Sequence, residues 1–159
     1  MFLITTADQR FWKKDDDILF LGEWCKIYDQ RHSWSELNYK VLPYHWDDRE
    51  KLYQDYLYLD TVSEKYLALL TDKLNSLHQA NYSLRYWRIV IGYWLYYFID
   101  VLFDRYLSIK SASDSGLVSD TWICPQNIER WAPNDFAAFE KWFCSDEYNH
   151  YLYLSLIHI

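Results

Sequence analysis

The sequence predicts an α/β fold, in which a short parallel sheet near the N-terminus is covered by long helices. Short apolar runs stand near the N-terminus, and a segment that can hold a short helix separates the second run from the third. Two long stretches with helical periodicity follow. The chain has only three Gly and three Pro, so long irregular loops are few. Fully apolar short strands separated by a helical segment are typical of a parallel sheet that is covered on both faces.

Three apolar runs are predicted to be strands, and their length and bounding residues favour strands over helices. The runs are residues 2–6, 18–22 and 39–43. Three Asp precede the second run and Gly22 ends it, whereas Pro43 ends the third. We expect a short helix within residues 23–38 and a further short strand at residues 121–124.

A long amphipathic helix is predicted to begin at Asp47, because apolar residues then recur every three or four positions. Asp47 and Glu50 resemble a capping box with Asp in the first position, and both acids suit the positive end of a helix. The apolar positions that define the expected buried face are Leu52, Tyr56, Leu59, Val62, Tyr66, Leu70, Leu74 and Leu77.

A second long helix is predicted from Ser83, a good N-cap, to about Ile109. Its centre, residues 89–99, is apolar on all sides, which is typical of a helix buried in a large protein. Residues 111–116 read as a loop. A third helix should start at residues 133–135 and continue through the sequence FAAFEKWF.

Composition limits the function classes. Apolar residues make up 51% and aromatic residues 21% of the 159 residues, which fits one domain with a sizeable core. The net charge of −7 and the lack of a basic stripe argue against a nucleic-acid binder. The three Cys fit no metal-ligand spacing, so we expect reduced thiols and no metal site.

Targeting signals and cofactor motifs are also missing from the sequence. The N-terminus lacks the basic region of a signal peptide. The longest uncharged apolar run, residues 89–99, falls well short of the roughly 20 residues that span a bilayer. We expect a cytoplasmic protein without a transmembrane segment, and peripheral membrane association stays open. No phosphate-binding loop, dinucleotide fingerprint, nucleophile elbow or zinc-protease motif occurs, so no cofactor is expected.

The last six residues, LSLIHI, read at the nucleic-acid level like a transposon adapter from sequencing libraries. We therefore expect residues 154–159 to be translated adapter. Such residues do not belong to the natural fold and should make few specific contacts. On this interpretation residues 1–153 form the N-terminal α/β domain of a longer protein. The alternative is a terminal strand or helix end packed on a core.

Polar residues beside tryptophans follow each predicted strand, and in open parallel sheets ligands bind outside the carboxyl ends of the strands. The candidates at these ends are Thr6, Asp8, Arg10, Glu23, Trp24, His45, Trp46, Asp47 and Asp48. Histidine exchanges protons near neutral pH, so His45 is the candidate general base, with Asp47 and Asp48 as adjacent candidates. Structural alternatives remain open: core packing for the tryptophans, helix capping for Asp47 and a satisfied structural role for His45.

Arg85 and Arg88 fall in the first turns of the second long helix, where the helix dipole disfavours cations. A negative partner should compensate. One alternative is an internal salt bridge to Glu23, Asp47 or Asp48. The other is a ligand phosphate, in which case the two arginines form an anion clamp.

Four stretches together resemble one family: FLITTADQRFW, LFLGEWC, LPYHWDDREKLYQDYLYL and SLRYWRIVIGYWLYYFIDVLFDRY. Over residues 2–110 the chain resembles the N-terminal part of the transferases encoded in bacterial O-antigen and surface-polysaccharide clusters. The resemblance implies a cytoplasmic transferase that uses an activated sugar or another phosphorylated donor and a glycan or lipid-linked acceptor. It also implies a two-domain nucleotide-sugar-transferase fold, with this chain as an incomplete first domain that is inactive alone.

The resemblance assigns no catalytic residue, but it places two groups of candidates in family-like phrases. The first group is Arg10, Glu23, Trp24, His45, Trp46, Asp47, Asp48 and Arg49, and the second is Arg85, Trp87 and Arg88. The alternative function is non-catalytic: a helical binding or scaffold module that docks a partner through exposed Trp and Tyr.

Overall fold

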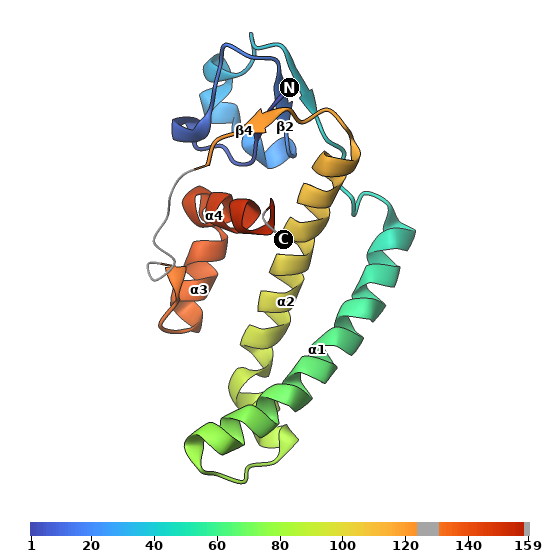
Figure 1. The fold of residues 1–159 in the computed structure, drawn as a ribbon, viewed down its shortest axis with the longest axis vertical. Helices are drawn as coiled ribbons and strands as arrows, with labels where there is room; N and C mark the ends of the chain where they lie inside the picture. The colour runs from blue at the N-terminus through green and yellow to red at the C-terminus, as the bar shows by residue number, and fades with distance from the viewer. Residues whose placement is uncertain (124–130, 158–159) are drawn as a thin grey trace. The chain divides into compact units, whose positions relative to one another are not determined.

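The computed structural model describes residues 1–123 and 131–157, and the chain divides into two compact units (Figure 1). The first unit combines Met1–His45 with Asp104–Ile159, and it contains the sheet. The second unit, Trp46–Phe103, is helical.

The first unit is built on a sheet of four short parallel strands, which confirms the predicted α/β class. The strands are β1 (Phe2–Ile4), β2 (Ile18–Phe20), β3 (Tyr39–Val41) and β4 (Asp120–Thr121), in the spatial order β3-β2-β1-β4. Phe2 pairs with Ile18 on one side and with Asp120 on the other. Each of the first three strands is shorter than its apolar run. The fourth begins one residue earlier than predicted, and Cys124 lies outside the described residues.

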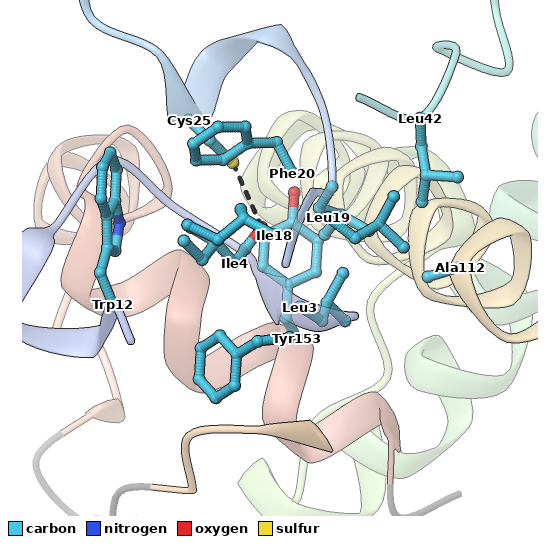
Figure 2. Packing of buried hydrophobic residues seen from close by; sticks show 12 residues of the cluster. Leu3, Ile4, Trp12, Ile18, Leu19, Phe20, Cys25, Leu42, Ala112 and Tyr153 are labelled. Atoms are coloured by element: carbon cyan, nitrogen blue, oxygen red, sulfur yellow. Dashed lines mark hydrogen bonds between the residues drawn. The ribbon is translucent and has the colours of Figure 1, made fainter. Parts of the chain in front are cut away.

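The two central strands form the core of this unit. Every residue of β1 and β2 is buried, as expected for strands covered on both faces, whereas β3 and β4 are partly exposed edges. Figure 2 shows Tyr153 and Ala112 packed among the strand residues. Cys25 Sγ donates to the Ile4 carbonyl at 3.4 Å, and burial raises the pKa of this thiol to about 12, so the thiol stays protonated.

The short helix expected within residues 23–38 is present as two 3-10 helices. η2 covers Glu23–Cys25 and η3 covers Tyr28–Ser33, with a kink at Gln30. A similar turn, η1 (Gln9–Phe11), follows β1. Such short pieces suit tight connections between strands that are only three residues long.

The second unit contains α1 (Arg49–His78) and the first part of α2 (Leu84–Asp114), joined in an antiparallel hairpin. Asp48, not Asp47, is the N-cap of α1, because its carboxylate accepts from Lys51 N at 3.1 Å. The predicted cap of α2 is confirmed: Ser83 Oγ accepts from Tyr86 N at 3.2 Å.

The buried face of α1 differs from the predicted one. The buried residues are Leu59, Ser63, Leu67 and Thr71, spaced four apart. Of the predicted set, Tyr56, Tyr66 and Leu77 are exposed. Tyrosine has an apolar ring with a polar tip, so it marks helical period without fixing which side of the helix is buried.

Two expectations for α2 are wrong. The apolar centre is not buried all round, since Ile89 is 75% and Tyr93 is 61% exposed. The helix also runs to Asp114, through most of the stretch read as a loop. It ends near Gly116, whose φ of 64° lies in the left-handed region that favours glycine at helix ends.

Two short helices close the first unit. α3 (Phe136–Phe143) follows directly on residues 133–135, where its start was predicted, and Asp135 caps it by accepting from Ala138 N at 2.7 Å. α4 (Asp146–Ile157) was not predicted as a separate helix. The terminal stretch that was expected to make few contacts continues α4 to Ile157 and buries Leu154.

Candidate functional site

The strand order places a topological switch point beside β1. The chain leaves β1 toward β2 on one side, and β4 joins β1 on the other side. In open parallel sheets, ligand crevices lie at such points, outside the carboxyl ends of the strands. Thr5 and Thr6 follow directly after β1, and both are buried.

A cavity of about 510 Å³ lies at this position, within the first unit. Its wall combines residues after β1 and β2 with residues of α2, α3 and α4. It mixes aromatic rings with a guanidinium, a carboxyl group, an amide, a thiol and the hydroxyls of Thr6 and Tyr153. The lining residues are Thr6, Trp24, Ile27, Arg105, Phe143, Cys144, Asp146, Asn149 and Tyr153. Such a combination of rings and a few polar groups is typical of a small-molecule site.

Trp24 is held rigidly in the cavity wall. Its indole Nε1 donates to the Thr5 carbonyl at 3.0 Å, and its ring meets Tyr44 edge-on, with ring centres 6.0 Å apart. The ring also lies over Gly22: a Cβ at that position would be 2.1 Å from Trp24 Cζ3. Because Trp24 remains 37% exposed, it presents part of a fixed ring to the cavity.

Arg105 supplies the guanidinium of the wall, and its charge is balanced inside the protein. It forms an ion pair with Asp104, and its Nε donates to Asn149 Oδ1 at 2.8 Å. Its guanidinium also lies 5.7 Å from the ring centre of Tyr153. These contacts fix Arg105 and join α2 to α4.

Asp104 is the centre of a polar cluster that includes the predicted base. Tyr44 OH donates to Asp104 Oδ1 at 2.8 Å, and His45 Nε2 lies 3.2 Å from the same oxygen. Burial acts to raise the pKa of Asp104, but the hydrogen bond from His45, the charge of Arg105 and the hydrogen bond from Tyr44 outweigh it, so the pKa is lowered. Asp104 is therefore ionised and can orient the imidazole of His45, as a carboxylate does in a proton-transfer pair.

Thr6 and Asp146 are two polar residues that line the cavity. One has an unpartnered hydroxyl and the other has a raised pKa. Thr6 is 2% exposed, and its Oγ1 finds no hydrogen-bond partner among residues 1–123 and 131–157. Asp146 Oδ1 accepts from Ala7 N at 3.4 Å, and burial raises the pKa of its carboxyl group. Asp146 can consequently act as hydrogen-bond donor or acceptor nearer to neutral pH than an exposed aspartate can.

Most of the other predicted residues are not among the described residues that line the cavity. Asp8 and Arg10 pair with each other, and Glu23 pairs with Lys26 at 2.9 Å. Trp46 Nε1 donates to Asp55 Oδ2 at 2.9 Å within the second unit.

The remaining candidates also belong to the second unit, which contains Asp47, Asp48 and both helix arginines. Arg88 forms a two-point ion pair with Glu64, with both N–O distances 2.7 Å. The internal-pair alternative therefore describes Arg88, but its partner is Glu64 and not Glu23, Asp47 or Asp48. Arg85 is exposed in the first turn of α2.

Within residues 1–123 and 131–157, no group of three or more His, Cys, Asp and Glu is placed to hold a metal ion. Over the same residues, none of the helices combines the length and apolar character that crossing a bilayer requires.

Comparison with known families decides the identity of the chain. A sequence model described as LIC12162 family transferase matches residues 1–159. The chain belongs to the LIC12162 family of transferases. The match continues past residue 110, where the resemblance noted from the sequence ended. No curated protein and no solved structure matches the chain.

In this LIC12162 family member, sequence reasoning found Thr6, Trp24 and His45 but missed the residues that complete their surroundings. Asp104 and Arg105 are not among the site residues predicted from the sequence, and in the structure they form an ion pair and are largely buried. One signal was available: the pair lies near the long uncharged apolar stretch of the same helix, residues 89–99, and charged residues beside such a stretch are rarely buried without partners. No comparable sequence signal marked Asp146 or Asn149. Both lie on α4, which was not predicted as a separate helix.

Proposed function

We propose that this LIC12162 family transferase moves a glycosyl group from an activated, phosphorylated sugar donor to a glycan or lipid-linked acceptor in the assembly of O-antigen or another surface polysaccharide. Three observations support this. The family is one of transferases. The four quoted phrases resemble transferases of surface-polysaccharide clusters. A cavity lined by aromatic rings and by hydroxyl, amide and carboxyl groups lies at the carboxyl edge of the parallel sheet.

The observation that carries the proposal is the buried contact between His45 and Asp104, joined to the cavity wall through the Asp104–Arg105 ion pair. We propose that His45 takes the proton of an acceptor hydroxyl. The hydroxyl oxygen then forms a bond to the anomeric carbon of the donor. The bond from that carbon to the phosphate oxygen breaks, and the phosphate leaves with the electron pair.

The predicted site residues of the second unit fall into two groups: those held by contacts within the protein and those exposed to solvent. Asp48 caps α1 and Arg88 is held by Glu64, so we propose structural roles for both. Arg85 and Asp47, both exposed, stay candidates for contacts to donor phosphate and acceptor, respectively. We further propose a cytoplasmic location and a two-domain layout in which this chain supplies the acceptor side, so that residues 1–159 alone turn over no nucleotide sugar.

Deletion and complementation in the bacterium that carries the gene test this function. Deletion should remove or shorten the surface-polysaccharide ladder on an electrophoresis gel, and the natural gene should restore it. His45→Gln should fail to restore the ladder, whereas His32→Gln, at an exposed histidine in η3, should succeed. An unchanged ladder after deletion would contradict the proposed pathway.

The helical binding module remains the second candidate, and one observation favours it. The exposed apolar residues of α2 in the second unit include Tyr86, Ile89, Val90, Tyr93 and Tyr97. If this surface alone carries the function, His45→Gln should restore the ladder fully, and Tyr93→Ser should not. The complementation assay therefore separates catalysis from docking.

A further inference from the structure

We infer that the cavity in the first unit binds a neutral, hydroxyl-rich ring, a pyranoside, with one face on Trp24, and that it excludes phosphate. The inference deepens the proposed function and rests on it for its biological role, because a glycan acceptor would present such a ring. Three properties of the cavity wall carry the inference: its form, its free hydrogen-bonding capacity and its charge.

Trp24 has the properties of a stacking platform. Its position is fixed by the Thr5 carbonyl, by Tyr44 and by the close approach to Gly22. A ring that is already ordered loses little entropy when a ligand binds to it. The apolar C–H face of a pyranose can therefore bury surface against the exposed part of the indole.

Polar groups beside the platform suit hydroxyl groups, which both donate and accept hydrogen bonds. Thr6 Oγ1 has no partner among residues 1–123 and 131–157, and Thr6 lines the cavity. A buried hydroxyl without a partner costs free energy that a ligand hydroxyl could recover. Asp146 and Asn149 add a carboxyl group and an amide to the same wall.

The charge balance of the wall disfavours an anion. Among residues 1–123 and 131–157, Arg105 is the only Lys or Arg that lines the cavity, and Asp104 already neutralises it. Asp146 adds a negative group, and Asp8 lies near enough to affect it electrostatically. A phosphate would enter a site without net positive charge and would lose its hydration, whereas a neutral ring avoids both costs.

Saturation-transfer NMR on the 159-residue chain tests the inference, with methyl glucopyranoside, galactopyranoside and mannopyranoside as probes. At least one should bind, with a dissociation constant on the order of 1 mM, a value reasonable for so small a ligand. Inorganic phosphate at equal concentration should not displace it. Displacement by phosphate, or no binding of any of the three glycosides, would overturn the inference.

Matched variants locate the binding. Trp24→Ala and Gly22→Ala should each weaken the glycoside by about tenfold or more, the first by removing the ring and the second by displacing it. Trp122→Ala, at an exposed tryptophan outside the cavity wall, should leave the affinity unchanged. Thr6→Val should weaken binding, and Thr6→Ser should retain it. Equal affinity of wild type, Trp24→Ala and Thr6→Val would place the sugar elsewhere and refute the site.

The two proposals fail in different ways. If the glycoside binds at Trp24 but the polysaccharide ladder is intact after gene deletion, the pocket is real and the proposed pathway is wrong. If the ladder disappears but no glycoside binds, the pathway stands and the pyranoside pocket is wrong.

Discussion

Thr5 Oγ1 lies 2.7 Å from His150 Nδ1, in a buried hydrogen bond between residues that are 145 positions apart in the chain. The bond links the end of β1 to α4, beside the cavity. His150 is 1% exposed and stacks on Phe11 with ring centres 3.9 Å apart. Burial lowers the pKa of His150 to about 4, and the charge of Asp8 opposes this only in part.

The free energy of unfolding should therefore fall as the pH drops from about 6.5 to about 4. The unfolded chain binds a proton on His150 near pH 6.5, whereas the folded chain binds it only near pH 4, so the unfolded state holds more protons in this window. Between pH 7 and pH 5 the loss from this group should be about 2 kcal/mol. Urea denaturation at both pH values measures it.

His150→Asn is the control for that pH effect, because it removes the titrating group and keeps a polar side chain near Thr5. The variant should lose less stability than wild type over the same pH interval, by about 2 kcal/mol. Carboxyl groups such as Asp146 titrate in both proteins and cancel in the comparison. An identical pH slope in the variant would show that His150 does not titrate as described.

Asp104→Ala should destabilise the folded protein by about 3 kcal/mol, because it leaves Arg105 and Tyr44 without their shared partner in a largely buried position. Asp100→Ala is the matched control on the same helix. Burial raises the pKa of Asp100, so its charged form is disfavoured and its loss should cost little. Urea denaturation measures both losses. Equal losses in the two variants would contradict the stabilising role of the polar cluster around Asp104.

Gly22→Ala should lower the free energy of unfolding by about 1–3 kcal/mol, because the new methyl group would overlap the Trp24 ring. Gly116→Ala is a useful contrast. That position has open space around it but a φ of 64°, so the cost should be about 1 kcal/mol and purely conformational. Only Gly22→Ala should change the near-ultraviolet circular dichroism of the tryptophans. The same spectrum for both variants would argue against the close packing of the Trp24 ring on Gly22.

Arg88→Ala should destabilise the protein by at most about 1 kcal/mol, because Arg88 and Glu64 are 45% and 37% exposed at their side chains and solvent screens the pair. Thermal melting with and without phosphate checks a second point. A phosphate-dependent increase in Tm that Arg88→Ala abolishes would revive the anion clamp.

The sequence by itself determined the features that depend on neighbouring residues. Apolar runs bounded by Asp, Gly or Pro located the first three strands, and Ser83 and Asp135 located two helix starts. These signals are local, because a cap or a strand boundary acts over a few residues. The parallel arrangement was also predictable, since fully apolar strands need cover on both faces.

Only the tertiary structure decided which side of each helix is buried and which polar groups meet. The tyrosines of α1 and α2 obey helical periodicity but tolerate water, so periodicity alone placed Tyr56 and Tyr66 on the wrong face. The contacts of Asp104 with Tyr44 and His45, and of Thr5 with His150, join distant segments. Such contacts form because burying a charge or hydroxyl requires a partner, and only packing determines which partner is within reach.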